Sequence, residues 1–239
     1  VMPHLAVVLF GPSRVTLGGR DVTGFGYDKV RALLVYLVVE ADHPQHRDVL
    51  AALLWPEQSE PSALSYLRRA LAVLRQAIGD QDAQPPFLLR TRTSLQINRM
   101  SDYELDVATF TALLAACPRH ADPGVACATC APHLQQAVDL YRGDFLEHGF
   151  RQEGAALTEW MAIRREELRR KALGVLARLV TYYDQAGNVV AAEQAARRHV
   201  ALDPWNEPAH RRLMRLPAGA GQRSLAIQQY ERFRRILAD

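Results

Sequence analysis

The sequence predicts a mainly α-helical protein with a small β component, divided into two domains. Three observations support this prediction. The first 100 residues read as short strands, then three helices, then a β-hairpin. From Ser101 onward the spacing of apolar residues is almost wholly helical. Near the end of the chain, Gly187 and Gly221 are separated by the tetratricopeptide period of about 34 residues, which indicates stacked helix pairs.

The composition is that of a globular protein with ample core material. Of the 239 residues, 49% are hydrophobic and 23% are charged. No apolar run approaches the roughly 20 residues that a membrane-spanning helix needs. The first residues, VMPHLAVVLFGP, lack the basic start and cleavage pattern of a signal peptide. We therefore expect a cytoplasmic protein that does not act at a membrane.

The basic residues are almost all arginines. The formal net charge of +3 does not by itself indicate a nucleic-acid partner. Of the 29 basic residues, however, only Lys29 and Lys171 are lysines. Arginine is the better bidentate ligand for phosphate and guanine. A GC-rich genome would produce the same bias, so composition leaves both explanations open.

The N-terminal elements follow one another in a recognisable order. Residue patterns predict strands at 5–10, 14–19 and 20–22, helices at 28–40, 47–55 and 62–79, and a hairpin at 87–98. Pro61 suits the first turn of the third helix, and Gly79 suits its C-cap. This order is that of a winged helix-turn-helix of the OmpR type, in which the third helix enters the major groove of DNA and the hairpin reaches the neighbouring groove.

The third helix carries an outward face without carboxylates. Its apolar stripe consists of Leu64, Leu67, Leu71, Leu74 and Ile78. A helix in the major groove must present donors to base edges and avoid carboxylates, which the phosphates would repel. The outward face and its flanks carry Ser62, Ser65, Tyr66, Arg68, Arg69, Ala72, Arg75 and Gln76.

Position on the helix suggests different roles for these side chains. Arg69 lies almost opposite the stripe and is the candidate for a base-edge contact, with guanine as the expected base. Hydroxyl groups at the start of the helix can meet phosphate, and Arg68 and Arg75 are candidate phosphate clamps. Ala72 could sit beside a thymine methyl group. Any amphipathic surface helix also has a polar face, so the polar face alone does not indicate DNA binding. The prediction depends on the order of elements, in which this helix follows two others and precedes a basic hairpin.

All three cysteines lie in one window, CPRHADPGVACATCAPH. The spacing C-x2-H-x6-C-x2-C over Cys117, His120, Cys127 and Cys130 is typical of a zinc knuckle, with His133 as an alternative ligand. An odd number of cysteines argues against a disulfide framework. We therefore expect a closed, structural Zn²⁺ site. An incidental or reactive cysteine loop is the alternative.

The C-terminal part is expected to consist of helices separated by short loops. The helices are predicted at 106–116, 132–141, 153–186, 189–202, 206–215 and 222–238. The long helix at 153–186 is expected to break once near Gly174, and PAGAG at 217–221 is expected to be a loop between helices.

Several stretches together resemble a known family of regulators. They are RALLVYLVVEADHPQHRDVLAALLWPE, SALSYLRRALAVLRQAIG, FLLRTRTSLQIN, YELDVATF, LYRGDFL and the Arg- and Leu-rich helix after Trp160. In this order, they resemble the Streptomyces antibiotic regulatory protein type, in which an OmpR-like winged helix precedes a tetratricopeptide-like bacterial transcriptional activation domain. Pro217 departs from the family pattern, because that pattern would let its helix run on.

The resemblance implies a DNA-binding domain at 1–100 and an activation domain at 101–239. The zinc-knuckle loop that the cysteine spacing predicts, at 117–133, falls within the second domain and is not part of the family pattern. It implies a sequence-specific transcriptional regulator, an activator, that binds double-stranded DNA as a homodimer on direct repeats. By the same analogy, Arg47 and the wing residues Arg90, Arg92 and Thr93 complete the DNA contacts. The loop WPEQSEP at 55–61 matches one that can touch RNA polymerase, although an ordinary capped turn explains it equally well.

No sequence pattern indicates an enzyme. Phosphate-binding loops, nucleophile elbows and His-Glu-x2-His helices are all missing from the sequence. The alternative to a DNA-binding regulator is a protein-interaction or signal-sensing scaffold whose winged helix no longer binds DNA. Related proteins often continue into an ATPase or another signalling domain, and the chain lacks a polar terminal cap, so we expect it to be the front of a longer protein.

Overall fold

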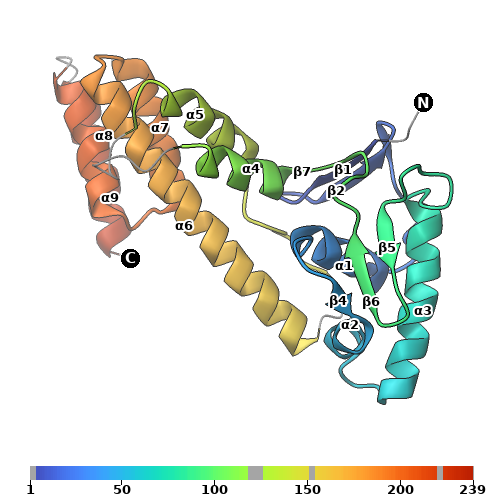
Figure 1. Cartoon of the computed structure of the whole chain (residues 1–239). Helices are drawn as coiled ribbons and strands as arrows, with labels where there is room; N and C mark the ends of the chain where they lie inside the picture. Colours follow the sequence, from blue (N-terminus) through green and yellow to red (C-terminus); the bar gives the residue numbers. More distant parts are fainter. Residues whose placement is uncertain (1–3, 118–125, 151–153, 220–222, 239) are drawn as a thin grey trace. The chain divides into compact units, whose positions relative to one another are not determined.

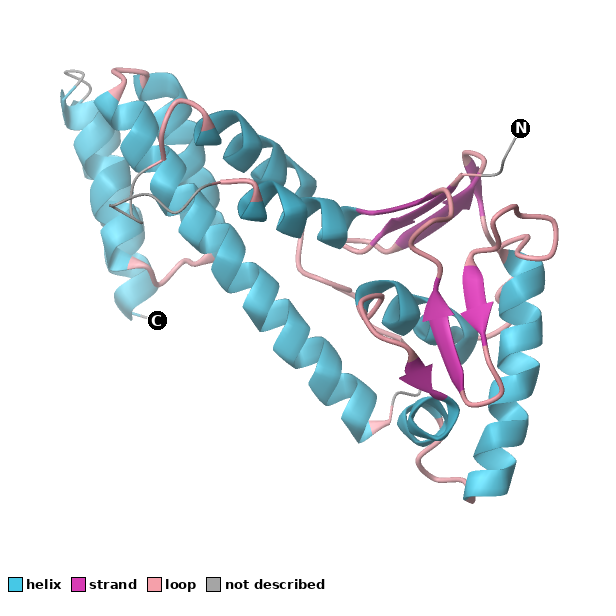
Figure 2. Cartoon of the chain, in the orientation of Figure 1, coloured by secondary structure: helices cyan, strands magenta, loops and turns pink. Residues whose placement is uncertain are grey.

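The computed structural model describes residues 4–117, 126–150, 154–219 and 223–238 (Figure 1). Helices dominate this part of the chain, and the strands are short (Figure 2). The strands are β1 (Leu5–Val8), β2 (Arg14–Leu17), β3 (Arg20–Asp21), β4 (Gln45–His46), β5 (Leu88–Arg90), β6 (Ser94–Ile97) and β7 (Tyr103–Leu105). The helices are α1 (Asp28–Val39), α2 (Arg47–Leu54), α3 (Glu60–Ala77), α4 (Asp106–Ala115), α5 (Cys130–Leu140), α6 (Ala155–Gln185), α7 (Val189–Leu202), α8 (Glu207–Gly219) and α9 (Arg223–Ala238). The predicted fold class is confirmed.

A four-stranded sheet with the order β3-β2-β1-β7 opens the fold. β1 and β2 are antiparallel, with Leu5 opposite Leu17. β7 joins the other edge of β1 in parallel, with Leu5 opposite Tyr103. Sequence analysis missed β7, because three residues show no alternation long enough to predict a strand.

The winged helix-turn-helix follows this sheet. α2 and α3 pack against each other, and α1 packs against both. The wing is a three-stranded sheet with the order β4-β6-β5, in which Gln45 of β4 lies opposite Leu95 of β6. β4 falls in the segment ADHPQH, which the sequence presented only as a polar break.

The ends of α3 agree with their sequence signals. Pro61 lies in the first turn, where its missing N–H disrupts no helical hydrogen bond. Gly79 follows the last turn with φ +64°, a left-handed conformation that costs glycine little. The helix therefore stops where the chain must turn toward the wing.

Asp106, the first residue of α4, ties that helix to the end of β1. Its buried carboxylate accepts hydrogen bonds from the backbone N–H groups of Leu9 and Phe10, at 2.9–3.0 Å. It also accepts one from the N–H of Val107 at 2.8 Å. One side chain thus satisfies three backbone donors that would otherwise be buried without a partner.

The chain forms two compact units. The first contains residues 1–109 and 143–165, and the second contains residues 110–142 and 166–239. Within the first unit, the indole of Trp160 donates to Glu40 Oε1 at 2.8 Å, and Arg164 pairs with the same oxygen at 2.7 Å. Residues 143–165 therefore pack with the winged helix, although they come more than 30 residues after it in the sequence. The predicted division into domains at residue 100 stays a prediction.

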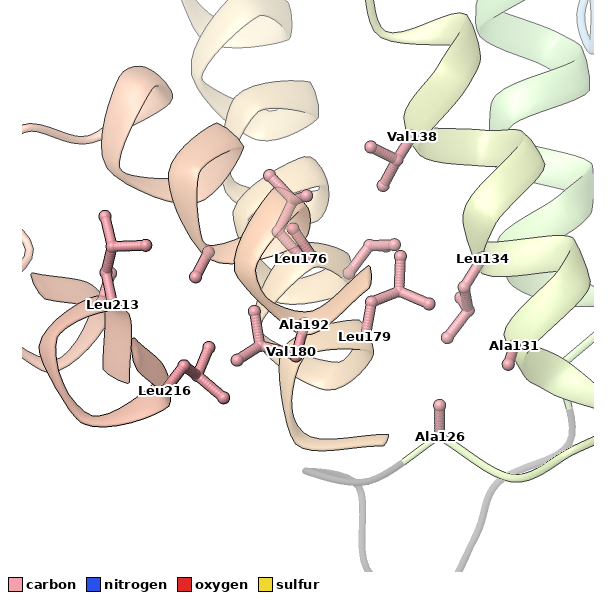
Figure 3. Packing of buried hydrophobic residues seen from close by; sticks show 14 of the residues in the cluster. Ala126, Ala131, Leu134, Val138, Leu176, Leu179, Val180, Ala192, Leu213 and Leu216 are labelled. Carbon is pink, nitrogen blue, oxygen red and sulfur yellow. The ribbon is translucent and has the colours of Figure 1, made fainter. Parts of the chain in front are cut away.

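The second unit is a set of packed helices with one apolar core. α8 packs against both α7 and α9, as stacked helix pairs of a tetratricopeptide-like repeat do. The core joins α5, α6, α7 and α8, with Leu134, Leu179, Val180 and Leu213 among its buried side chains (Figure 3).

The predicted break of the long helix near Gly174 is wrong. α6 runs without interruption from Ala155 to Gln185. A single glycine inside a helix costs about 1 kcal/mol relative to alanine. Val175, Leu176 and Leu179, which follow Gly174, are all buried in the core, and their burial outweighs that cost.

The prediction that 217–221 is a loop is also wrong in its first part. α8 continues through Pro217 to Gly219. Proline removes one helical hydrogen bond, but Leu213 and Leu216 beside it are buried. Residues 220–222 lie outside the described part of the chain. Within the described residues, no helix has both the length and the apolar character to cross a membrane.

Replacing Asp106 with alanine should lower the free energy of unfolding by about 2–4 kcal/mol, because buried N–H groups lose their acceptor. Urea denaturation followed by circular dichroism measures the change. The matched control is Asp102→Ala, which removes an exposed pair with His4 and should cost at most about 1 kcal/mol. Equal losses for the two variants would contradict the role given to Asp106.

Candidate nucleic-acid interface

α3 has one buried face and one face that carries the predicted contacts. Leu67, Leu71, Leu74 and Ile78 of the predicted stripe are buried, whereas Leu64 is half-buried. The side chains on the opposite face that are exposed are Tyr66, Arg68, Arg69, Ala72 and Gln76. Exposure agrees with the expected outward face, which stays a candidate for base contacts.

The first turn of α3 carries hydroxyl groups. Ser59, the N-cap residue, donates from its Oγ to Ser62 Oγ at 3.0 Å. Ser62 and Ser65 are both half-buried at the margin of the outward face. These hydroxyls stay candidates for phosphate contacts beside the exposed arginines, although the exposed carboxylate of Glu60 lies in the same turn.

Arginines from three elements meet around one hollow. This hollow, of about 390 Å³, is lined by His46, Arg47, Asp48, Leu64, Leu67, Arg68, Arg92 and Thr93. They come from the start of α2, from α3 and from the tip of the wing. We call Arg47, Arg68, Arg90 and Arg92 the arginine cluster. The structure thus brings together side chains that sequence analysis could assign only one by one.

Two other members of the arginine cluster act electrostatically on Arg47. Burial lowers the pKa of the Arg47 guanidinium, and the positive charges of Arg90 and Arg68 lower it further. Arg47 is held in place by hydrogen bonds from Nε and Nη2 to the carbonyl oxygen of Thr91, at 3.3 and 3.1 Å. Like charges held this close favour binding of an anion between them.

The wing tip has its own internal support. Thr91 Oγ1 accepts from the N–H groups of Thr93 and Ser94, at 3.2 and 2.9 Å. The N–H of Arg47 donates to the carbonyl oxygen of Thr93 at 2.9 Å. The tip is therefore joined to the start of α2.

Arg75 differs from the other arginines of α3. Its Nε donates to Asp80 Oδ2 at 2.8 Å, and the side chain of Asp80 is 1% exposed. Asp80 Oδ1 accepts the N–H of Leu88, the first residue of β5, at 2.9 Å. Arg75 thus neutralises a buried carboxylate that links α3 to the wing, and its expected role as a phosphate clamp stays a prediction.

A second hollow is lined in part by Arg69 and contains residues that sequence analysis missed. It is lined by Tyr27, Asp28, Lys29, Trp55, Gln58, Tyr66, Arg69 and Val73. The rings of Trp55 and Tyr66 stack with centroids 6.1 Å apart, and Lys29 Nζ lies 5.7 Å from the centroid of Trp55. Burial raises the pKa of Tyr27, an effect that the charge of Arg69 opposes. Lys29 is one of only two lysines in the chain, a signal that could have drawn attention to it.

The loop at 55–61 forms the connection between α2 and α3. Trp55 is the C-cap of α2, and the N–H of Gln58 donates to its carbonyl oxygen at 3.1 Å. Glu57 and Glu60 are exposed. The loop therefore presents two carboxylates beside the outward face of α3.

The cysteines are separate from this interface. Cys117, Cys127 and Cys130 are free thiols, and His120 lies outside the described residues. The N–H of Cys130 is the largest influence that lowers the pKa of Cys127, whereas burial raises the pKa of Cys130 to about 12. Within the described residues, no three His, Cys, Asp or Glu side chains are already arranged around a metal-sized point.

Comparison with known proteins finds one matching family, related regulatory proteins and a solved structure of the same fold. Residues 105–239 match the family described as "Bacterial transcriptional activator domain". The chain is 27% identical over 139 residues to "Transcriptional regulatory protein EmbR" of Mycobacterium bovis and of Mycobacterium tuberculosis, a match that covers 58% of this chain and 35% of those proteins. A solved structure, "Mycobacterium tuberculosis EmbR in complex with low affinity phosphopeptide", has the same fold, with a TM-score of 0.72 and 23% identity. That match covers 99% of this chain and 60% of the other, so the chain spans less than two thirds of these relatives.

Replacing Arg75 with alanine should lower the free energy of unfolding by about 1–3 kcal/mol, because the carboxylate of Asp80 stays buried without its cation. Hydrogen exchange at the amide of Leu88 should become faster as the wing loosens. Arg68→Ala, which truncates an exposed arginine of the same helix, is the control. It should leave the exchange at Leu88 unchanged and should not lower the free energy of unfolding, because it relieves repulsion within the arginine cluster. An Arg75→Ala variant as stable as Arg68→Ala would contradict the structural role of Arg75.

Proposed function

The chain belongs to the bacterial transcriptional activator domain family, and from this premise we propose that it is a sequence-specific DNA-binding regulator that activates transcription. The observation that carries the proposal is the arginine cluster, which gathers beside an exposed helix face in a winged helix-turn-helix fold. That fold inserts its third helix into the major groove and its wing into the adjacent groove. No catalytic role is proposed.

In this proposal, α3 reads bases with its outward face. Arg69 donates to the acceptor atoms of guanine, and Ala72 lets the helix approach the base pairs closely. Gln76, one turn beyond Ala72 on the same exposed face, can pair with a base edge or a phosphate. Tyr66 keeps its ring stacked on Trp55 and turns its hydroxyl toward the backbone of the DNA.

The arginine cluster holds the DNA backbone. Arg47 and Arg68 bind phosphate at the edge of the major groove, while Arg90, Arg92 and Thr93 follow the backbone into the neighbouring groove. Their mutual repulsion is relieved when phosphates enter the hollow between them. Ser62 and Ser65 add neutral donors at the start of α3.

The partners follow from the same premise. We propose that the exposed glutamates of the loop at 55–61 face RNA polymerase, and that two copies bind direct repeats on double-stranded DNA. We also propose a cytoplasmic location and a longer protein in which an ATPase or signalling domain follows. The helical repeats supply protein contacts, since stacked helix pairs present extended surfaces.

Selection from a pool of random duplex DNA tests the proposed base reading. The wild-type chain should enrich one motif, a direct repeat, and Arg69→Ala should lose discrimination at one or two positions, about 1–3 kcal/mol each. The control is Arg20→Ala, which truncates an exposed arginine of β3 and should enrich the same motif as the wild type. No enrichment by the wild type at low salt would favour the scaffold alternative, in which the winged helix docks proteins instead.

Salt dependence tests the phosphate role of the arginine cluster. Arg92→Ala should weaken binding to all sequences alike, and the slope of log K against log salt should become shallower by about 1, because one phosphate contact is lost. Fluorescence anisotropy with a specific and a scrambled duplex measures both slopes. A loss confined to the specific duplex would assign Arg92 to base reading.

A further inference from the structure

Three thiols gather where α4 ends and α5 begins, within the second compact unit. The thiol of Cys117 lies 3.9 Å from the carbonyl oxygen of Cys130 and 3.6 Å from that of Leu113. The thiol of Cys130 also forms hydrogen bonds with the thiols of Cys117 and Cys127. These are all the cysteines of the chain, and no disulfide joins them.

The turn before α5 is organised around the sulfur of Cys127. The backbone N–H groups of Thr129 and Cys130, two and three residues further on, donate hydrogen bonds to this sulfur. The N–H groups of Cys130 and Ala131 also donate to the carbonyl oxygen of Cys127, at 3.0 and 2.9 Å. These hydrogen bonds fix the turn that joins Cys127 to Cys130.

The fourth side chain comes from α5. His133 is half-buried and follows Cys130 by three residues in the helix. Residues at i and i+3 are neighbours on a helix surface, so the imidazole lies one turn along from the Cys130 thiol. Three thiolates and one imidazole form a ligand set typical of structural zinc.

We propose that Cys117, Cys127, Cys130 and His133 bind one Zn²⁺ ion as a closed structural site. Each cysteine gives up its thiol proton when the metal binds, so three protons are released for each zinc ion, and neutral His133 binds through a ring nitrogen. With four protein ligands, no position stays open for water or substrate. Because these side chains are not already arranged around one point, binding requires side-chain rotation toward Zn–S distances of about 2.3 Å.

The site would stabilise the helical-repeat unit. Cys130 is part of the buried core, and Cys117 and Cys127 pack against it. A zinc ion would cross-link the end of α4 to the start of α5, and it would replace the weak contacts between thiols with metal–ligand bonds. None of the four ligands belongs to the DNA interface, so metal binding should affect stability more than DNA recognition.

Metal analysis of the full chain, purified without a polyhistidine tag under reducing conditions, tests the proposal. After equilibration with zinc and dialysis, elemental analysis should find about one zinc ion per chain. With Co²⁺ instead, the absorption spectrum should show the thiolate-to-metal charge-transfer band and the d–d bands of a tetrahedral site. Removal of the metal by a strong chelator should lower the melting temperature, and added zinc should restore it.

Variants separate this site from adventitious binding. Cys130→Ser and Cys127→Ser should each lose the zinc and the charge-transfer band. His133→Ala should bind zinc at least tenfold more weakly. His43→Ala, which truncates an exposed histidine of the first unit, is the matched control and should keep the zinc of the wild type.

Three results would overturn the proposal. The first is wild-type protein that holds no zinc after equilibration. The second is a protein that holds zinc but whose Co²⁺ form lacks the charge-transfer band, which would place the metal away from the cysteines. The third is disulfide formation under mild oxidation at the same rate with and without zinc. Bound zinc would protect the thiolates and slow this reaction. The cobalt spectrum of the wild type needs no variant, so misfolding of a serine variant leaves the test valid.

Discussion

The buried carboxylate of Asp80 is the constraint on which the nucleic-acid interface depends. It lies just beyond the end of α3, where the side chain of Arg75 and the backbone of Leu88 both donate to it. A carboxylate this deeply buried is tolerated only when its charge is paired and its oxygens accept hydrogen bonds. The pairing therefore fixes the last turns of α3 and the first residue of the wing to the same point. From there β5 and β6 carry Arg90 and Arg92 back toward Arg47 and Arg68.

The arginine cluster illustrates a conflict between stability and function. Bringing four guanidinium groups together is unfavourable, and the lowered pKa of Arg47 reflects both its burial and its charged neighbours. The fold tolerates this arrangement because the backbone of the wing holds it, through Thr91 and Thr93. Groups of like charge that repel one another in the free protein are frequently found at sites that bind ions of the opposite charge.

Sequence reasoning predicted the elements that depend on local residue pattern. It failed for elements whose conformation depends on contacts with residues far away in the sequence. The stripe of α3 predicted Leu67, Leu71 and Leu74 as buried, because helical periodicity is a local property, whereas Leu64 at the start of the stripe is half-buried. The short strands β4 and β7 were missed, since two or three residues become a strand only beside β6 and β1. Local propensity predicts a helix break at Gly174, but its cost of about 1 kcal/mol is smaller than the stabilisation from the buried core residues that follow. The pairing of Arg75 with Asp80 joins residues on either side of a helix end, and no periodic pattern indicates it.

Residues 143–165 match the activation-domain family, yet they pack in the same compact unit as the winged helix. Glu40, at the end of α1, accepts hydrogen bonds from both Trp160 and Arg164, and the ring of Tyr36 lies 5.0 Å from that of Trp160. The family match begins at residue 105, but this boundary does not separate two independently packed parts of the protein. If recombination exchanged DNA-binding domains between such regulators, residues 143–165 would have to be exchanged with them. Otherwise, other side chains would have to replace the contacts that Trp160 and Arg164 make with the end of α1.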